Sequence, residues 1–422
     1  MRVGKIQRHQ TNEDSIYRVS VDSERGTYSL WFSVENEHDD YVCKDKHDAF
    51  LLALLPIAMK NGEDIYVDGR VSEKLFYDLS RFAITVLSEA RRDLRPISIH
   101  PEELAGPDAH NTATAVGAAF SGGVDSFCTF LDNFTDDVPH NYKITHLFIS
   151  NTGAVGQGSL EKSLNDFKLE KEFIKKIARN IPIQFVSVNS NIAEISPFQH
   201  INVHTSMNFS AVLLLQNLFK KFYYSSGVSF KDIHIGPAEE STYSEAVMIP
   251  LYCTETLEFI GYGGQFKRSE KTSRIAESKL AQKYLYVCFD HLRHAGHNCS
   301  RCEKCRRTMA TLDALGKLED FSDRFDISRF KNDRERYLFN LMRNRGEPSN
   351  RDILDLMAQR HYQLPLYVRT AAELSRIVVP PAMLSWLKDR LPDQAKTHIK
   401  NNLARISRRP AGGPPRPTGN QS

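Results

Sequence analysis

The sequence predicts an α/β fold: a doubly wound parallel sheet with an N-terminal α+β domain and a C-terminal helical extension. Short apolar segments alternate with amphipathic helical ones between residues 115 and 288, which is typical of parallel strands joined by crossover helices. The first 105 residues begin with a hairpin pattern instead, and beyond Ala314 the apolar spacing becomes helical. We expect domains at 1–105 and 115–315, a helical region at 316–407 and a disordered tail at 408–422.

The N-terminal part predicts a small α/β arrangement without a chemical motif. Two segments with period 2, 15–21 and 27–35, flank a turn at Arg25-Gly26 and predict a hairpin. A helix interrupted at Pro56 and a strand closed by Asp68-Gly69 are expected next, at 48–60 and 65–67. Ser72 is then the expected N-cap of a helix with one apolar face. Residues 105–114 have the composition of a linker.

The alternating part begins at Ala115–Phe120, an apolar run expected of a strand buried on both faces. Further strands are expected at 146–150, 183–188, 232–236 and 284–288, and helices at 160–179, 205–222, 333–343, 349–360, 371–377 and 382–390. Ligands bind beyond the carboxyl ends of the strands in such sheets. This rule indicates three ligand-binding loops, at 121–126, 151–158 and 237–245.

Composition narrows the class of protein. The 422 residues carry a formal net charge of +3, but six basic residues follow the last acidic one, Asp393. Without these six, 49 basic residues face 52 acidic ones, which disfavours a large nucleic-acid-binding surface. The N-terminal residues lack the apolar core of a signal peptide, and the best apolar run, 49–59, is too short to span a bilayer. Seven cysteines, an odd number, suit a reducing compartment. We expect a cytoplasmic protein without membrane contact.

The hexapeptide after the first alternating strand is the strongest motif in the chain. It comprises Ser121, Gly122, Gly123, Val124, Asp125 and Ser126, and a helix follows it directly. The glycines allow positive φ and a close approach to the backbone, and amides converging at a helix N-terminus attract anions. The pattern therefore predicts a phosphate-binding turn, with a turn that binds nothing as the alternative. The chain contains no GxxxxGK[ST] motif, so hydrolysis of a γ-phosphate by a P-loop is not supported.

SGGVDS resembles the signature of the PP-loop ATP pyrophosphatases, also called adenine nucleotide alpha hydrolases, which have a HUP-like fold. The resemblance implies binding of ATP with Mg²⁺ and cleavage to AMP and pyrophosphate. Asp125 would orient the loop or a Mg²⁺ shell, and Asn151 and Thr152 would meet the ribose or adenine. Arg268 and Lys271 share a helical face and are the expected catalytic partners of Asp125 on phosphate oxygens, with a solvated basic patch as the alternative.

Four of the seven cysteines form a C-x10-C-x2-C-x2-C cluster: Cys288, Cys299, Cys302 and Cys305. Four thiolates at such spacing can hold Zn²⁺ tetrahedrally, so we expect a structural zinc site. An iron–sulfur cluster and a redox dithiol are the alternatives. Histidines between the cysteines could replace a sulfur ligand: His291, His294 and His297.

The loop and the cysteine cluster together resemble the 7-cyano-7-deazaguanine synthases, the queuosine branch of the PP-loop enzymes, over residues 115–315. The resemblance implies zinc at the cysteines and ATP-dependent conversion of a carboxylate to an amide and then a nitrile. The intermediate would be adenylated, with ammonia as nitrogen donor. Glu239, Glu240 and Tyr243 in the expected substrate loop would bind the substrate, with a helix cap or an exposed loop as the alternative.

The chain also departs from that family. It is nearly twice the expected size, and Asn151-Thr152-Gly153 stands where an aromatic-Gly-Gln segment is expected. The substrate is therefore 7-carboxy-7-deazaguanine or, in a paralogue, another carboxylate. Two other functions stay open: a tRNA-thiolating PP-loop enzyme, and a nucleotide-binding component of a multi-protein system, such as a defence system. The regions outside 115–315 could contact a protein partner.

Overall fold

The computed structural model describes residues 1–108, 111–154, 160–238, 240–288 and 296–378. The chain divides into two compact units, each considered by itself. The first comprises Met1–Asp333 with Asp355–Tyr362, and the second comprises Arg334–Leu354 with the residues from Gln363 on. Within the described residues, no helix has the length and apolar character needed to cross a membrane.

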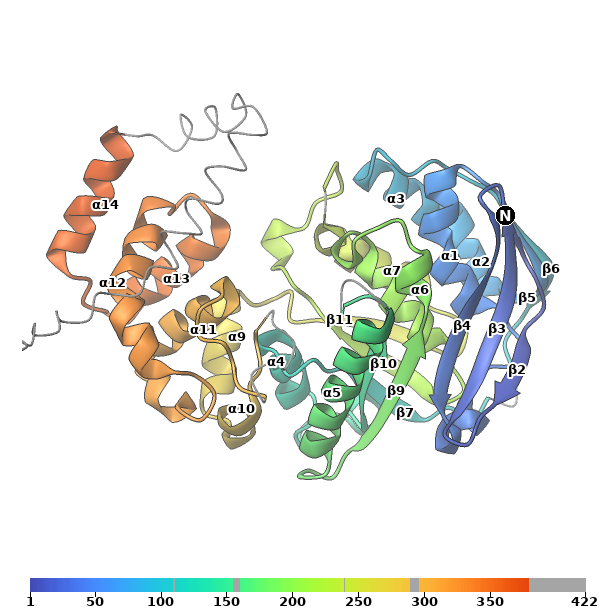
Figure 1. Cartoon of the computed structure of the whole chain (residues 1–422), viewed down its shortest axis with the longest axis horizontal. Coiled ribbons are helices and arrows are strands. Elements are labelled where there is room, and N and C mark those ends of the chain that lie inside the picture. Colours follow the sequence, from blue (N-terminus) through green and yellow to red (C-terminus); the bar gives the residue numbers. More distant parts are fainter. Residues whose placement is uncertain (109–110, 155–159, 239, 289–295, 379–422) are drawn as a thin grey trace, which may run out of the picture. The chain divides into compact units, whose positions relative to one another are not determined.

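The first unit is an α/β structure built on one mixed sheet, which has eleven strands in the described part of the chain. The strands are β1 Arg2–Val3, β2 Gln7–Gln10, β3 Asp14–Ser23, β4 Gly26–Glu35, β5 Ile65–Ser72, β6 Ile99–Ala105, β7 Ala115–Ala119, β8 His146–Asn151, β9 Gln184–Ser190, β10 Phe219–Ser225 and β11 Glu258–Tyr262. Their order is β11-β10-β7-β8-β9-β4-β3-β1-β5-β6, with β2 beside β3 (Figure 1).

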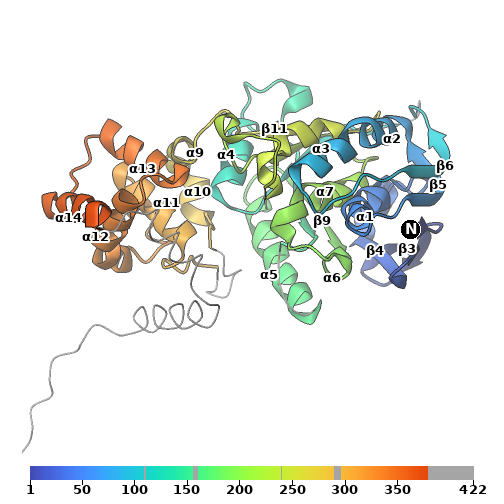
Figure 2. The same cartoon turned by 90° about the horizontal axis from the view of Figure 1, so that it is seen from above.

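The helices alternate with the strands after β7 and follow one another towards the end of the described chain. They are α1 Asp48–Asn61, α2 Glu73–Asp78, α3 Ile84–Ala90, α4 Val124–Asp132, α5 Leu160–Ala178, α6 Ile192–Ile195, α7 His200–Leu213, α8 Glu245–Met248, α9 Arg268–Ala276, α10 Lys279–Tyr284, α11 Glu303–Ala314, α12 Ile327–Arg343, α13 Pro348–Gln359 and α14 Leu366–Val378. Helix α9 packs on α4, and α11 packs on α9 (Figures 1 and 2).

Strands β7 to β11 form the parallel part of the sheet, as the alternating pattern predicts. Strand β7 lies in the middle: the chain proceeds to β8 and β9 on one side, and then returns to β10 and β11 on the other. A reversal of this kind is a topological switch point, and it leaves a crevice at the carboxyl ends of the two flanking strands. The SGGVDS turn follows β7 and therefore lies at this switch point.

The sheet continues across the boundary predicted at 105–115. Strand β4 pairs antiparallel with β9, and the register places Phe32 opposite Ser190. Asn191 reinforces the joint, because its side chain accepts from the Trp31 amide at 2.9 Å and donates to the Ser29 carbonyl at 2.9 Å. The first 105 residues and the alternating strands thus share one sheet and one compact unit.

One large core lies between this sheet and the packed pair α1 and α7. Alternate residues of the strands contribute to it, such as Phe148 in β8 and Val186 and Val188 in β9. Helix α1 was expected to be interrupted at Pro56, but the helix runs through it. Proline inside a helix costs about 3 kcal/mol. Nearly every residue of α1 is buried, so packing outweighs that cost.

One expected helix, 205–222, and two expected strands, 232–236 and 284–288, are wrong in part or in full. The apolar run at 205–222 is helical only to Leu213, and its end forms β10 instead. Residues 232–236 begin in a 3-10 turn, Phe230–Asp232, and form no strand, while β11 was not anticipated. Residues 284–288 end α10 and continue without a ladder partner in the described chain, because the amides of Tyr286 and Val287 bond to Gly122 and Asn298. Strand β5 also continues past Asp68-Gly69 to Ser72.

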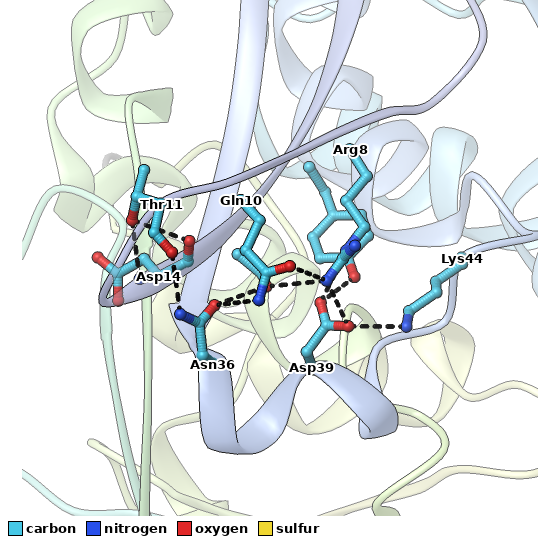
Figure 3. Close-up of polar contacts among 9 residues, drawn as sticks. Arg8, Gln10, Thr11, Asp14, Asn36, Asp39 and Lys44 are labelled. Atoms are coloured by element: carbon cyan, nitrogen blue, oxygen red, sulfur yellow. Dashed lines mark hydrogen bonds and ion pairs between the residues drawn. The ribbon is translucent and has the colours of Figure 1, made fainter.

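A cluster of ion pairs and hydrogen bonds connects strands β2 and β3 to the 3-10 turn Asn36–Tyr41 (Figure 3). Arg8 and Lys44 pair with Asp39 at 2.9 and 3.0 Å, and the Tyr17 hydroxyl donates to the same carboxylate. Burial acts to raise the pKa of Asp39, but the hydrogen bonds from Tyr17, Lys44, Ser15 and Arg8 outweigh it and lower the pKa below its ordinary value.

Asp39 should therefore make unfolding sensitive to acid. A carboxyl group with a lowered pKa in the folded state stabilises above its unfolded pKa of about 3.9 and loses that contribution as the pH falls below it. We expect Asp39→Asn to lower the free energy of unfolding at neutral pH and to flatten its decline below about pH 4. Urea unfolding of both proteins across this range would measure the effect, and parallel declines would contradict it.

Candidate active site

The SGGVDS turn has the backbone that its glycines permit. Gly122 has φ of +73°, and its carbonyl accepts from the Tyr286 amide at 2.7 Å. A Cβ at Gly122 would lie 3.3 Å from Cε1 of Phe173. Gly123 is the N-cap of α4, and the Ser126 hydroxyl donates to its carbonyl at 3.1 Å. The helix thus begins directly behind the turn, which is the arrangement that favours an anion.

We expect Gly122→Ala to destabilise the turn. A left-handed backbone costs a residue with a side chain about 1–2 kcal/mol, and the contact with Phe173 adds to this. Urea unfolding would measure the loss in the free energy of unfolding. Gly346→Ala is the control, because an added Cβ there meets nothing within 4 Å. Equal free energies of unfolding in both variants would contradict the expectation.

The Asp125 carboxylate pairs with both Arg268 and Lys271, which were expected to bind phosphate oxygens. Arg268 begins α9 and pairs with one oxygen, while Lys271 Nζ pairs with the other at 3.1 Å. The side chain of Asp125 is 21 % exposed, and that of Lys271 is only 2 % exposed. The expectation that both residues share one helical face is thus confirmed, and Lys271 is not part of a solvated patch.

Lys271 lies close to residues that follow three strands, β7, β10 and β11. Its Nζ donates to the Ser226 carbonyl, just after β10, at 2.6 Å and to Asp125, just after β7. Gly263 follows β11 with φ of +92°, and a Cβ there would lie 3.2 Å from Cε of Lys271. Lys271 therefore lies at the switch point. A side chain at position 263 would come too close to the Lys271 side chain.

The charges around Asp125 keep it ionised. Burial acts to raise its pKa, but the positive charges of Arg268 and Lys271 outweigh burial and lower the pKa below its ordinary value. One carboxylate faces two cations here, so the group carries a net positive charge. Such a group, beside amides at a helix N-terminus, can attract a polyanion.

A cavity of about 150 Å³ lies beside the turn. Its lining comprises Ser121, Gly123, Asp125, Ser126, Glu170, Phe173, Arg268, Tyr286, Val287, Cys288 and Lys304. Burial raises the pKa of Glu170 to about 7. The sequence gives no signal for Glu170, which lies on a charged amphipathic helix, or for Lys304, which lies between two cysteines of the cluster.

Asn151 and Thr152 are buried and bonded within the protein. The Asn151 side chain donates to Asn189 at 2.9 Å and accepts from Ser163 at 3.1 Å. The Thr152 hydroxyl donates to Asn208 at 2.6 Å. Neither residue lines the cavity beside the turn.

The hydrogen bond from Thr152 to Asn208 instead belongs to a network of polar side chains. The Asn208 amide donates to the Tyr224 hydroxyl at 3.0 Å, and His204 contacts that hydroxyl at 2.9 Å and the Thr242 hydroxyl at 3.1 Å. The helix predicted at 205–222 contains Asn208 but neither His204 nor Tyr224, so the predicted elements did not bring these side chains together.

The expected substrate residues lie in the long connection between β10 and β11. The loop 237–245 was placed after a strand, but 232–236 form none. Glu239 lies outside the described residues. Glu240 is exposed and precedes the 3-10 turn Ser241–Tyr243, without capping it through its side chain. The ring of Tyr243 packs on His234 with centroids 4.7 Å apart. The cavity beside the turn is lined by neither Glu240 nor Tyr243.

The four cysteines do come together. Their Sγ atoms all lie within 4.8 Å of one another, with 3.4 Å between Cys302 and Cys305 and 3.8 Å between Cys299 and Cys305. The Cys302 amide donates to the Cys299 sulfur at 3.3 Å, and Cys302 is the N-cap of α11. The group could therefore hold a metal ion. His291 and His294 lie outside the described residues, and exposed His297 contacts the Asp323 carbonyl instead.

The electrostatics of the cluster suit a cation. The hydrogen bond between Cys302 and Cys305, burial, and the charges of the other sulfurs all raise the pKa of Cys305. A divalent cation would reverse this effect, because it stabilises thiolates. Buried Asn298 fixes the surrounding backbone: it accepts from the Val287 amide at 2.8 Å and donates to the Leu285 carbonyl at 3.0 Å.

The cluster and the turn are also connected. Cys288 lies two residues after Tyr286, whose amide bonds to Gly122, and both residues line the cavity. Comparison with protein-family models, with curated proteins and with solved structures found no match for this chain.

Proposed function

We propose that this chain is an ATP-dependent adenylating enzyme with a PP-loop-like nucleotide domain. It would activate a carboxylate with release of pyrophosphate, for conversion to an amide and then a nitrile. The observation that carries the proposal is the SGGVDS turn at the switch point, with Arg268 and Lys271 both on its Asp125. Anions bind at such turns, and ligands of α/β sheets bind at such positions.

Each residue type in the site suits one part of this reaction. The amides from Ser121 to Ser126 would hold the leaving pyrophosphate, and Arg268 and Lys271 would neutralise its charge. Asp125 and Glu170 offer carboxylate oxygens beside the cavity, and Mg²⁺ prefers oxygen ligands. The four cysteines would hold zinc as a structural ion, since four sulfurs leave no open coordination position.

The acceptor would be a small-molecule carboxylate, and the nitrogen would come from ammonia. We take 7-carboxy-7-deazaguanine as the first acid to test, because the loop and the cysteine spacing both resemble the enzymes that use it. A paralogue acting on another acid would keep the same chemistry at phosphorus.

A product assay tests the proposal. Purified protein would be incubated with ATP, Mg²⁺, ammonium and 7-carboxy-7-deazaguanine, and AMP, ADP and pyrophosphate would be resolved separately. AMP that depends on the acid, with an amide or nitrile product, would support the proposal. ADP in place of AMP would overturn it, and so would ATP binding without AMP or pyrophosphate, which would favour a sensor or scaffold.

The cysteine cluster favours one second candidate, a tRNA-thiolating PP-loop enzyme. In that case the four sulfurs would carry an iron–sulfur cluster or the transferred sulfur. Anaerobic purification followed by iron analysis and a visible spectrum separates the two. Iron with visible absorbance would favour thiolation, and zinc in a colourless protein would favour the adenylating enzyme.

A further inference from the structure

Lys304 is a cation of the cavity beside the SGGVDS turn that has no role so far. Among the described residues, two basic side chains line this cavity, Arg268 from α9 and Lys304 from α11. Lys271 is not one of the lining residues: it is buried, and its Nζ donates to Asp125 and to the Ser226 carbonyl. A ligand in the cavity can therefore contact Arg268 and Lys304, whereas Lys271 acts on it through Asp125.

The first turn of α11 carries Lys304 next to a cysteine of the cluster. Lys304 directly precedes Cys305, and α11 packs on α9, which begins with Arg268 (Figure 1). Successive residues of a helix leave its axis about 100° apart, so the side chains of Lys304 and Cys305 point in different directions. The sulfur of Cys305 joins the other cysteines, and Lys304 lines the cavity together with Cys288. One helix start thus contributes to both the cluster and the cavity.

A ligand can enter this cavity, and the cavity has the size of one part of a nucleotide. Ser121 is exposed and the side chain of Arg268 is 24 % exposed, so solvent reaches the lining. The volume of about 150 Å³ corresponds to roughly five water molecules and lies below the ~300–1,000 Å³ of pockets that hold drug-sized ligands. The cavity therefore suits a phosphate or pyrophosphate group and is too small for a whole nucleoside triphosphate.

The charges of the lining define the ligand further. Asp125 and Glu170 also line the cavity, so two carboxyl groups accompany the two cations. A bare polyanion would be attracted by the cations and repelled by the carboxylates. Proteins usually bind Mg²⁺ through one or two carboxylates together with phosphates of the substrate. A phosphate group that carries Mg²⁺ therefore suits both the cations and the carboxylates.

We propose that Lys304 binds the pyrophosphate group, as its Mg²⁺ complex, in this cavity together with Arg268 and the amides of the turn. The inference rests on the proposed adenylating function, in which pyrophosphate is the leaving group. A lysine ammonium offers three donors to phosphate oxygens, and it places a positive charge where the leaving group carries its negative charge. The cysteine cluster, by holding the start of α11, thereby also positions a residue of the nucleotide site.

Binding of magnesium pyrophosphate to the full chain tests the proposal. Titration calorimetry would compare the wild type with Lys304→Met and Arg306→Met. We expect Lys304→Met to weaken binding by about 10- to 100-fold, the usual effect of losing one hydrogen bond to a charged group. Arg306→Met is the matched control: Arg306 directly follows Cys305 on the same helix, but it pairs with Asp333 at 2.9 Å and does not line the cavity. Its affinity should stay within about twofold of the wild type, and equal affinities in both variants would overturn the proposal.

Three further readouts distinguish a lost contact from a damaged site. Both variants should keep the metal content of the wild type, because neither residue supplies a sulfur ligand. Lys304→Met should bind AMP within about twofold of the wild type, because AMP lacks the two leaving phosphates. Omitting Mg²⁺ should weaken the binding of pyrophosphate to the wild type, since the carboxylates would then face a bare anion. Loss of metal, an equal loss of affinity for AMP, or binding that is indifferent to Mg²⁺ would each contradict the assignment.

The outcomes separate this inference from the adenylating function. If the wild type forms AMP with an acid and Lys304→Met binds magnesium pyrophosphate as tightly as the wild type, the inference fails and the adenylating function stands. If Lys304→Met loses pyrophosphate affinity but the wild type forms no AMP with any acid, the adenylating function fails and Lys304 remains a phosphate-binding residue. A wild type that does not bind magnesium pyrophosphate would overturn the inference.

Discussion

Replacing Lys271 by methionine is expected to lower AMP formation by ~10²–10³-fold, the usual loss when one charge-stabilising contact to a transition state is removed. Methionine fills much of the same buried volume, so the fold should survive. The substitution leaves Arg268 as the ion-pair partner of Asp125 among the described residues, and it removes the Lys271 donor from the Ser226 carbonyl. Because that carbonyl loses a buried hydrogen bond, we also expect a loss of about 1–3 kcal/mol in the free energy of unfolding.

Arg274→Met is the matched control for this experiment. Arg274 lies on the same helix as Lys271 but pairs with Asp132, and its side chain is partly exposed. We expect Arg274→Met to change AMP formation by less than about twofold, because Arg274 does not contact Asp125. The fold should also survive, since exposed ion pairs contribute about 0–1 kcal/mol to stability. Rates and circular dichroism melts would be measured for both variants. Equal rates in the Lys271 and Arg274 variants would remove Lys271 from the reaction.

Replacing Cys302 by serine is expected to abolish binding of the proposed metal ion and to reduce the yield of soluble protein strongly. A structural metal contributes its binding free energy to folding, because the unfolded chain has no preformed site. Here the ion would join Cys288 to the start of α11, and the segment before Cys288 holds the Gly122 carbonyl. Any soluble variant should therefore also bind ATP more weakly, as titration calorimetry would show.

Cys128→Ala is the control for losing a buried thiol outside the cluster. It should keep the full metal content by elemental analysis and should cost about 1 kcal/mol of stability. The structural-metal proposal fails if Cys302→Ser stays folded with an unchanged Tm. Chelation of the wild type should reproduce the Cys302→Ser melt, because both remove the same ion.

Much of the parallel part of the sheet could be predicted because its signals are local. The run Ala115–Phe120, the glycine turn and the helix after it follow one another without interruption, and β8, α5 and β9 lie within two residues of their expected bounds. The change from helix to strand between Leu213 and Phe219 could not be predicted, because apolar residues continue from the end of the helix into the strand and no glycine or proline separates the two. Strand β11 is short and contains Gly261, so it gave no signal.

Some features of the candidate site could likewise be predicted from the sequence, and others could not. The shared helical face of Arg268 and Lys271 and the meeting of the four cysteines could be anticipated from spacing in the sequence, but the ion pairs of both residues with Asp125 could not. The position of Glu170 beside the cavity could not be anticipated either, because a glutamate on a charged amphipathic helix is usually solvated. The joint between β4 and β9 also depends on tertiary contacts more than 150 residues apart.

That joint has a practical consequence for anyone who would truncate the chain. A fragment beginning at residue 115 would contain the whole SGGVDS turn and the cysteine cluster, and it would look like a minimal enzyme. Such a fragment would also lack β4, which pairs with one edge of β9. The exposed edge of β9 could then pair with other copies of the fragment. The same cut would strip α1 from α7 and expose an apolar helix face. We expect such a fragment to aggregate, so expression of this protein must retain its first 105 residues.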